Sequence, residues 1–488
     1  MKKNYILFLA ASTAIGASAA VFSTGGTGKT FTFKQLSEVD TTGITKVGGA
    51  YIVAKDFTVS ENDTLKLENN DTVKLTNKVS IIIAGTGLLN PSDTAYVTKA
   101  SDTDLPKGFR FMGKGVTARL KNVTFDYVGV SFFSEDGKGN LQADNCTWRY
   151  YNGKLSSSAA INFSNQSDGN VIKNCYFLQN TVGAVASGSN TPVGLDFTNN
   201  YLWHNTTDNK NRPQINLTTG ANHVLNIVGN KVIGGKFTMV GGISVSNMLN
   251  LSNTGSVTVK DNIVEDNRYG ITFLGNMNVE VLNNTIRNNK YETNANNGGS
   301  GISVYSNGQK TVVTGNLIEG NLWGATIINK CKNVNFGKTD NAAADDYNPG
   351  LNVFKDNGNN GVLYDLYNNT TETVYAQGNT WNVAVQDSAS IEQVIFHKVD
   401  NEALGLVIFM PSKSTGVDGV AATTTAAAYA AATEAITSPE PAQVAVFTPA
   451  GALVAKSGNA VTKFSVAGLA PGFYIARVGN ASVKFQKK

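Results

Sequence analysis

Residues suited to acid–base or metal chemistry are scarce in this chain. Its 488 residues include only three histidines, His204, His223 and His397, and no two of them stand at the spacing of a zinc site. His204 follows Trp203 at the start of a polar segment. It could contact a ligand there, although an ordinary surface loop is the simpler interpretation.

The acidic residues are spread out, and a single group stands out. Asp345 and Asp346 are adjacent in the segment 339–350, with Asp340 close before them. Hydrolysis of a glycosidic bond needs two carboxylates on either side of that bond, and no second group accompanies this one. The three aspartates could hold Ca²⁺, but a solvated acidic loop explains them as well. We therefore expect no cofactor other than this possible calcium ion, and the catalytic residues, if any exist, remain unknown.

Aromatic residues offer a better case for binding. Trp148, Arg149, Tyr150 and Tyr151 are consecutive, and Trp203 stands further along the chain. Aromatic rings present large flat apolar faces on which a sugar ring can stack. Trp148 falls in an apolar column and is expected to be buried. Arg149, Tyr151 and Trp203, with His204, are therefore the outward-facing candidates for contact with a ligand.

The elements that carry these residues come from a repeat. Each unit has an apolar residue, then any residue, then Asn, Asp or Gly, and another apolar residue three positions later. From Phe125 to Trp381 the repeat averages about 28 residues, which indicates a β-solenoid. The anchors are Phe125, Trp148, Phe177, Leu202, Val232, Val264, Ile286, Ile318, Phe354 and Trp381.

One column of the repeat is almost pure asparagine. It contains Asn200, Asn230, Asn262, Asn284, Asn316, Asn352 and Asn379. Stacked coils lie about 4.8 Å apart, so each amide can donate to the next amide and accept from the previous one. Cys146 and Cys175 precede these asparagines in the same column, and either two buried thiols or a disulfide would fit that position.

These features predict an all-β protein, a right-handed parallel β-helix of about ten to thirteen coils. It would span residues 21–411, including a cap at its N-terminal end. The region from about 50 to 410 resembles the pectin-lyase-like superfamily of right-handed parallel β-helices. That resemblance implies the fold but not an activity, because the superfamily includes lyases, hydrolases, epimerases, adhesins and inert stalks. Of the motifs of its polygalacturonase-like members, only Asp345-Asp346 is present.

The two ends of the chain predict export. Lys2 and Lys3, an apolar run and Ala17-Ser18-Ala19 are typical of a signal peptide over residues 1–20. No other segment is long and apolar enough to cross a bilayer. The near-balanced charge, +4, does not favour nucleic acid as a partner.

The C-terminal part differs in composition from the repeat. Residues 412–441 are rich in Ala, Thr and Pro and are expected to form a linker. Residues 442–488 have the pattern of a small β-sandwich. Their Leu469-x-Pro471-Gly472-x-Tyr474 element and Lys-Phe-x-Lys-Lys ending resemble the sorting domain of the type IX secretion system, found in Bacteroidota. The resemblance implies that the secretion machinery is a partner and that the protein reaches the cell surface or medium.

Two hypotheses about function follow. The first is a secreted or surface protein without enzymatic activity: an adhesin, a glycan-binding protein or a structural stalk. The second is a polysaccharide lyase or glycoside hydrolase acting on an acidic polysaccharide. An exposed group of carboxylates, or of carboxylates with Lys or Arg, would favour the enzyme, whereas an aromatic groove without such a group would favour binding.

Overall fold

A computed structural model describes residues 22–153, 158–251, 254–294, 297–413, 427–448, 452–479 and 481–487. The expected signal peptide, residues 1–20, lies outside the described residues. The chain divides into two compact units, Met1–Lys413 and Ser414–Lys488. Within the described part, no helix is long and apolar enough to span a membrane.

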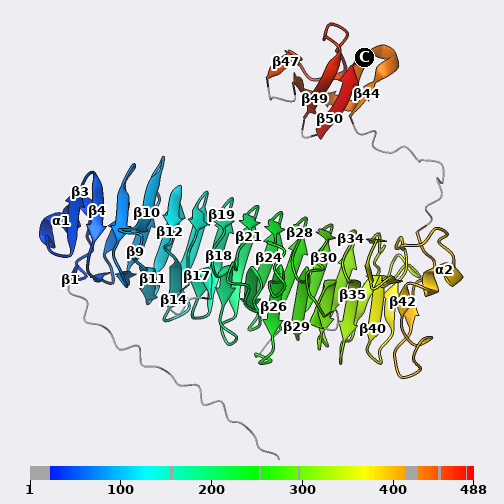
Figure 1. Ribbon diagram of the computed structural model, residues 1–488, viewed down its shortest axis with the longest axis horizontal. Helices are drawn as coiled ribbons and strands as arrows, with labels where there is room; N and C mark the ends of the chain where they lie inside the picture. Colours follow the sequence, from blue (N-terminus) through cyan, green and yellow to red (C-terminus); the bar gives the residue numbers. More distant parts are fainter. Residues whose placement is uncertain are drawn as a thin grey trace, which may run out of the picture. The chain divides into compact units, whose positions relative to one another are not determined.

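The first unit is a right-handed parallel β-helix, which confirms the predicted fold class (Figure 1). Three sheets run along its length, and each coil contributes one strand to sheet A, then one to sheet B and one to sheet C. Sheet A holds β1 (Phe22–Ser23), β5 (Phe57–Val59), β8 (Ser80–Ile83), β11 (Gly108–Gly113), β14 (Val130–Ser134), β17 (Ala159–Phe163), β20 (Gly183–Ser187), β23 (Ile215–Thr218), β26 (Ile243–Asn247), β29 (Ile271–Gly275), β32 (Ser300–Tyr305), β35 (Trp323–Ile328), β40 (Leu366–Asn369) and β42 (Ile395–Phe396).

The other two sheets complete each coil. Sheet B holds β2 (Thr30–Thr32), β6 (Thr64–Lys66), β9 (Thr86–Leu89), β12 (Thr117–Lys121), β15 (Asn140–Asp144), β18 (Ser167–Lys173), β21 (Val193–Thr198), β24 (Val224–Val228), β27 (Ser256–Lys260), β30 (Asn278–Leu282), β33 (Thr311–Thr314), β36 (Val334–Gly337), β41 (Val374–Ala376) and β43 (Val407–Ile408). Sheet C holds β3 (Ile44–Val47), β4 (Ala50–Val53), β7 (Thr72–Leu75), β10 (Ala95–Lys99), β13 (Val123–Asp126), β16 (Thr147–Arg149), β19 (Tyr176–Leu178), β22 (Tyr201–Trp203), β25 (Lys231–Ile233), β28 (Ile263–Glu265), β31 (Thr285–Arg287), β34 (Leu317–Glu319) and β37 (Val353–Lys355). A short hairpin, β38 (Gly358–Asn359) and β39 (Val362–Leu363), projects from one coil.

Both ends of the helix are covered. At the first end, α1 (Phe33–Val39) buries Phe33 and Leu36 against the core, and β3 pairs with β4 as an antiparallel hairpin. At the other end lies α2 (Ser388–Glu392), which buries Ile391. Sheets A and B contain 14 strands each, one more than the largest expected number of coils. The excess arises because residues 22–32, before the repeat becomes regular, already pair in these sheets.

The apolar anchors of the repeat form the core, as their spacing predicts. Phe125, Trp148 and Phe177 occupy equivalent positions in β13, β16 and β19 and are fully buried. Their rings stack with centroids 5.0 Å and 5.2 Å apart, which is close to the spacing of parallel strands. In the coil interior, aromatic residues of one coil therefore stack on aromatic residues of the next coil.

The seven asparagines of the predicted column are buried between sheets B and C and form a continuous ladder. Asn284 is typical: its amide donates to Val259 O at 2.8 Å and to Asn316 Oδ1 at 2.9 Å, and its Oδ1 accepts from the amide of Asn262. The residue before each ladder position turns the chain with a positive φ, 56° at Asn199 and 55° at Asn283. That conformation favours Asn, Asp and Gly, which explains why these types recur there.

A second polar ladder lies at the corner between sheets C and A. Each amide donates to the next member over distances of 2.7–3.1 Å. In one coil the repeat has Gly235 where the others have asparagine, and the side chain of Gln214 fills that place in the ladder. The ladder runs through Asn180, Asn205, Gln214, Asn267, Asn289, Asn321 and Asn357 and ends on Asp365.

The three cysteines are free and buried. Cys146 and Cys175 extend the first ladder: the Cys175 sulfur accepts a hydrogen bond from the Cys146 N–H, and burial raises the pKa of Cys175. Cys331 lies at another corner, where its thiol donates to Ile328 O. We expect a thiol reagent to find no fast-reacting thiol in the native protein and three after denaturation without reductant. A single thiol in the denatured sample would instead show that Cys146 and Cys175 form a disulfide.

The second unit has two small sheets around a shared core that includes Ile436, Val446 and Phe485. One sheet holds β44 (Ala428–Ala430), β45 (Ala435–Ala442) and β48 (Val461–Ser465), and the other holds β47 (Leu453–Lys456), β46 (Val444–Phe447), β49 (Gly472–Val478) and β50 (Ala481–Lys487). The expected linker, 412–441, is therefore too long at its C-terminal end. Residues 428–441 belong to this unit because Ile436 and Ala435 are buried in it, despite two nearby prolines.

Candidate functional site

A groove of about 650 Å³ lies on the outer face of sheet A, over strands β26 to β42. Its described lining includes no charged residue and no histidine. Two kinds of side chain dominate, aromatic rings and small hydroxyls. The rings are Tyr269, Trp323, Tyr364, Tyr367 and Phe396, and the hydroxyl residues are Ser244, Thr272, Ser300, Ser303 and Thr326.

The floor of the groove is a single column of the sheet. Ser244, Thr272, Ser303, Thr326, Tyr367 and Phe396 pair with one another in register through six successive strands. Side chains alternate along a strand, so the neighbours of these residues point into the core. In four coils the column has a small serine or threonine, so the groove is deep there. In the last two coils it has an aromatic ring, so the groove is shallower.

The aromatic residues at this end form one platform. The ring of Trp323 lies 4.1 Å from that of Tyr364 and 5.5 Å from that of Tyr367, and Tyr367 packs edge-on against Phe396 at 5.0 Å. Gly324 fixes the place of Trp323 at the start of β35. A Cβ on Gly324 would lie 2.3 Å from the carbonyl oxygen of Asp365, so the chain can make this close turn only with glycine.

A loop forms one side of the groove through Asn297 and Gly298. Arg268 holds the loop: its guanidinium pairs with Glu292 and donates to the Asn297 carbonyl at 2.9 Å. Burial raises the pKa of Glu292, but hydrogen bonds from the Asn294 N–H and from Arg268 lower it more, so the net shift is downward. These two charges therefore neutralise each other and hold the wall of the groove.

A second hollow of about 530 Å³ lies beside sheet B and contains the charges that the groove lacks. Its lining includes Lys310, Lys332, Lys338, Asp345, Asp346, Glu372 and Tyr375. The Lys338 ammonium lies 2.5 Å from Asp346 and 4.6 Å from the centre of the Tyr375 ring. The hydrogen bond that Lys338 donates to Asp346 raises the pKa of Lys338 and lowers the pKa of Asp346. Neither group is therefore suited to exchange a proton near neutral pH.

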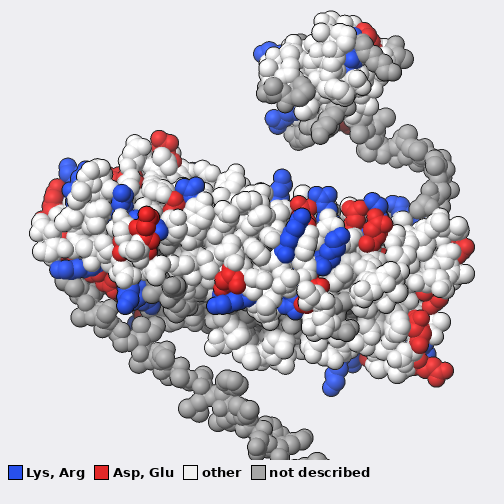
Figure 2. Space-filling model, in the orientation of Figure 1, with Lys and Arg blue, Asp and Glu red and all other residues white. Residues whose placement is uncertain are grey.

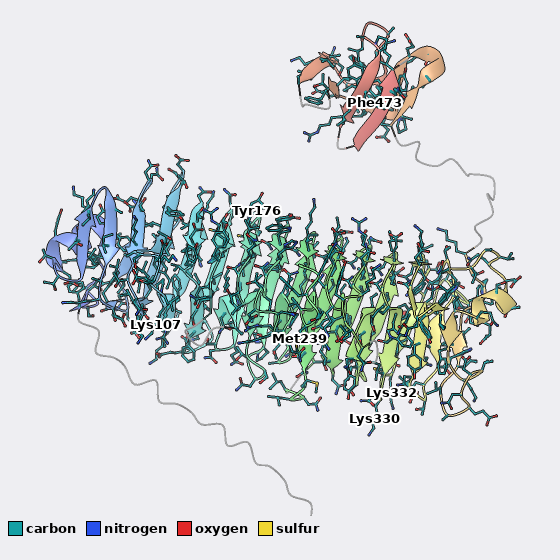
Figure 3. All side chains as sticks on the ribbon, in the orientation of Figure 1. Lys107, Tyr176, Met239, Lys330, Lys332 and Phe473 are labelled. Atoms are coloured by element: carbon teal, nitrogen blue, oxygen red, sulfur yellow. The ribbon has the colours of Figure 1, made fainter. Side chains whose placement is uncertain are left out.

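Figures 2 and 3 show how these charges are placed. Figure 2 shows Lys and Arg lying beside Asp and Glu, so no patch of a single sign covers the visible face of the β-helix. In Figure 3, Lys330 and Lys332 project next to each other at the lower edge of the helix. Lys332 is the one that lines the charged hollow.

The structure does not bring the expected calcium ligands together. Asp340 accepts a hydrogen bond from Gln377 at 2.8 Å, whereas Asp346 pairs with Lys338. Among the described residues, one group of three has the geometry of a possible metal site, and it contains none of the three expected aspartates.

That group is Glu392, His397 and Asp400. His397 Nδ1 accepts the Val407 N–H at 2.8 Å, and its Nε2 lies 2.7 Å from Glu392. Because both ring nitrogens already have partners, we interpret His397 as a structural residue that links α2 to β43 through buried hydrogen bonds.

The aromatic candidates expected from the sequence lie away from the groove, on sheet C and its corner. Tyr151 is only 2% exposed and packs over Gly129, so its expected outward orientation is wrong. Arg149 forms an ion pair with Asp126 of the preceding coil. Trp203 stacks on His204 with ring centroids 4.0 Å apart. Arg149, Trp203 and His204 are therefore partly exposed but lie apart from the groove. Tyr176, on the same sheet, is exposed at the upper edge in Figure 3.

Comparison with known proteins adds little. No protein-family model matches the chain, and no curated protein matches it. Among solved structures, the periplasmic alginate epimerase AlgG is similar at 13% identity, with 78% of this chain and 83% of that chain covered and a TM-score of 0.46. An aspartate-to-alanine mutant of AlgG gives the same identity and coverage with a TM-score of 0.47. Similarity at this level says nothing about activity.

A buried carboxylate lies directly behind the aromatic platform. Asp365 follows Tyr364 and accepts hydrogen bonds from the Asn357 amide and the Asn382 N–H. No side-chain cation among the described residues forms an ion pair with it. Burial raises its pKa to about 7 from 3.8, although those hydrogen bonds oppose the shift.

A raised pKa for a buried acid means that the folded state favours the protonated form. Its contribution to stability is complete below about pH 4 and is lost as the pH rises through about 7. Relative to Asp365→Asn, we expect the wild-type unfolding free energy to fall by up to about 4 kcal/mol over this range. Urea unfolding followed by tryptophan fluorescence would measure this, with Asp93→Asn at an exposed site as control. Parallel pH profiles for wild type and Asp365→Asn would contradict the expectation.

Proposed function

We propose that this chain binds a polysaccharide in the sheet A groove and does not cleave it. The observation that carries the proposal is the continuous surface made by the Trp323 platform and the row of serine and threonine hydroxyls. Aromatic faces match the apolar faces of sugar rings, and hydroxyls can exchange hydrogen bonds with sugar hydroxyls.

The rigidity of the scaffold favours binding. Every residue of the groove floor lies on a strand that is hydrogen-bonded to strands on both sides, or to the penultimate strand at the end of the sheet. Side chains held in place in this way lose little freedom when a ligand binds, which strengthens affinity. A concave site with a few placed polar groups among apolar ones is also the usual form of a ligand pocket.

The groove offers no means of catalysis among its described residues. Hydrolysis needs a carboxylic acid and a carboxylate on either side of the bond, and a lyase needs a base near the proton that it removes. Serine, threonine, tyrosine and asparagine supply the polar atoms here. Burial raises the pKa of Tyr269 to about 12, so this phenol is not ionised near neutral pH and cannot act as a base there.

Titration calorimetry with a panel of oligosaccharides tests this proposal, together with assays of the same mixtures for new reducing ends and for unsaturated uronates. Binding without product would support it. Product formation from an oligosaccharide, or the absence of binding across the panel, would contradict it.

The charged hollow supports a second candidate, a lyase or hydrolase acting on an acidic polysaccharide. Its lysines could attract uronates, and Asp345 and Glu372 lie on the same hollow. The Lys338→Ala variant tests this candidate directly. Loss of product formation in that variant, with unchanged activity in Trp323→Ala, would place an enzyme in the charged hollow.

We further infer that the protein is exported and that the second unit serves as its secretion signal. The sorting-domain features, Leu469-x-Pro471-Gly472-x-Tyr474 and the basic ending, support this. Gly472 begins β49 and Tyr474 donates a hydrogen bond to the Ala470 carbonyl, so the motif forms an ordered turn. Deleting residues 427–488 should leave the protein in the periplasm of its host, whereas unchanged amounts outside the cell would contradict this inference.

A further inference from the structure

Resting on the proposed function, we infer that the groove takes an uncharged polysaccharide chain that lies across the coils, parallel to the helix axis. Two independent features of the groove carry this inference. One is the charge of its lining, and the other is the direction in which its binding groups repeat.

The first feature is electrostatic. Every described residue that lines the groove is neutral. Arg268 and Glu292, which hold the loop at the side of the groove, are only 13% and 9% exposed at their side chains and are paired with each other. A uronate or sulfated sugar would have to leave water for a surface that offers its charge no cation, which is costly. A neutral sugar would lose only hydroxyl hydration, and the partly exposed hydroxyls of Thr272 and Ser303 can replace it.

The second feature is the direction of the repeat. The floor residues occupy one column, so a hydroxyl or ring recurs once per coil at the spacing of the strands, about 4.8 Å. A chain lying along the helix axis meets Ser244, Thr272, Ser303, Thr326, Tyr367 and Phe396 in turn. A chain lying along one strand would meet the outward side chains of that strand alone. The extended repeat of a hexose chain is close to the coil spacing, so successive sugars can make equivalent contacts.

The aromatic platform marks one end of the path that a bound polysaccharide would follow. Trp323 and Tyr364 flank the column where the floor rises to Tyr367 and Phe396. A sugar that reaches this point is stacked on rings, whereas sugars over the earlier coils contact hydroxyls. We therefore expect affinity to rise with oligosaccharide length until the hydroxyl row is filled, and then to level off.

Matched pairs of ligands test this inference. The probes are oligosaccharides of neutral glucan, mannan and galactan, each beside a derivative in which C6 is oxidised to a carboxylate. Calorimetry with the secreted protein should show one neutral series binding at least about tenfold more tightly than its oxidised partner. Its affinity should change little between about 50 mM and 500 mM salt, because no ion pair contributes to it. Tighter binding of an oxidised partner, with steep weakening by salt, would overturn the inference.

Two variants locate the binding. Ser303→Lys adds a cation to the middle of the floor and should bring the affinity for the oxidised chain up to or above that for the neutral chain. Lys332→Ala changes the charged hollow instead and should leave binding of the neutral chain unaltered. Loss of neutral binding in Lys332→Ala would overturn the inference. Absence of binding by both members of every pair would instead refute the proposed function itself.

Discussion

Replacing Trp323 with alanine will weaken oligosaccharide binding by at least about 30-fold, because a central aromatic anchor contributes about 2 kcal/mol or more to binding. Trp323 contacts both Tyr364 and Tyr367, at ring distances of 4.1 Å and 5.5 Å. Its loss removes one face of the platform and lets the two tyrosines move. Calorimetric titration of wild type and Trp323→Ala with the same oligosaccharide measures the effect.

A matched control exists in the same protein. Trp203 is also a half-buried tryptophan of the β-helix, and it stacks on His204 on a different face. Trp203→Ala should bind the oligosaccharide as the wild type does. Urea midpoints for the two variants would show whether each remains folded. Loss of binding in Trp203→Ala, with full binding in Trp323→Ala, would place the binding site on the surface around Trp203 and contradict the proposal.

Replacing Asn284 with alanine will lower the unfolding free energy by about 3–5 kcal/mol or prevent folding, because it leaves buried polar groups without partners. The Asn284 amide donates to Val259 O and Asn316 Oδ1, and its Oδ1 accepts from both the N–H and the amide of Asn262. Water cannot replace these bonds in the closed coil. Urea unfolding followed by tryptophan fluorescence reports on the β-helix alone, since all four tryptophans lie in it.

The chain itself provides a graded comparison. At the start of the same column, Cys175 accepts the N–H of Cys146 and donates to the Lys173 carbonyl, as an asparagine would in part. Asn284→Cys should therefore be less destabilising than Asn284→Ala. Asn278→Ala, at an exposed position of the same coil, should change stability by less than about 0.5 kcal/mol. Equal stability of Asn284→Ala and Asn278→Ala would show that the ladder is dispensable.

The fold could be predicted because its determinants repeat. The Asn284 column recurs in seven coils and the apolar anchor column of Phe125 in ten, so even one sequence contains many copies of the same pattern. The turn position also repeats for a local reason, the positive φ at residues such as Asn283. The second ladder was harder to recognise, since Gln214 joins it from a different place in the repeat.

The groove could not be predicted in the same way. Its floor takes one residue from each of six strands, and outward positions such as Ser303 and Tyr367 follow no apolar pattern. Only the register of the strands brings them into one column.

Tyr151 was expected to face outward, but it is buried. It follows an anchor by three residues, and the turn at Tyr150, with a φ of 61°, directs it back into the core.

The linker ends earlier than its composition predicts. Composition around Ala430 suggests an unstructured segment, yet β44 and β45 pair as a hairpin there and Ile436 packs into the second core. Tertiary burial of a few apolar residues outweighs the weak strand preference of alanine and proline.

A crystal structure with a bound neutral oligosaccharide tests the central claim most directly. It should show an intact chain along the Ser244–Phe396 column, with one sugar stacked on Trp323. A chain bound in the hollow beside Lys338, or a cleaved product in either place, would contradict the claim.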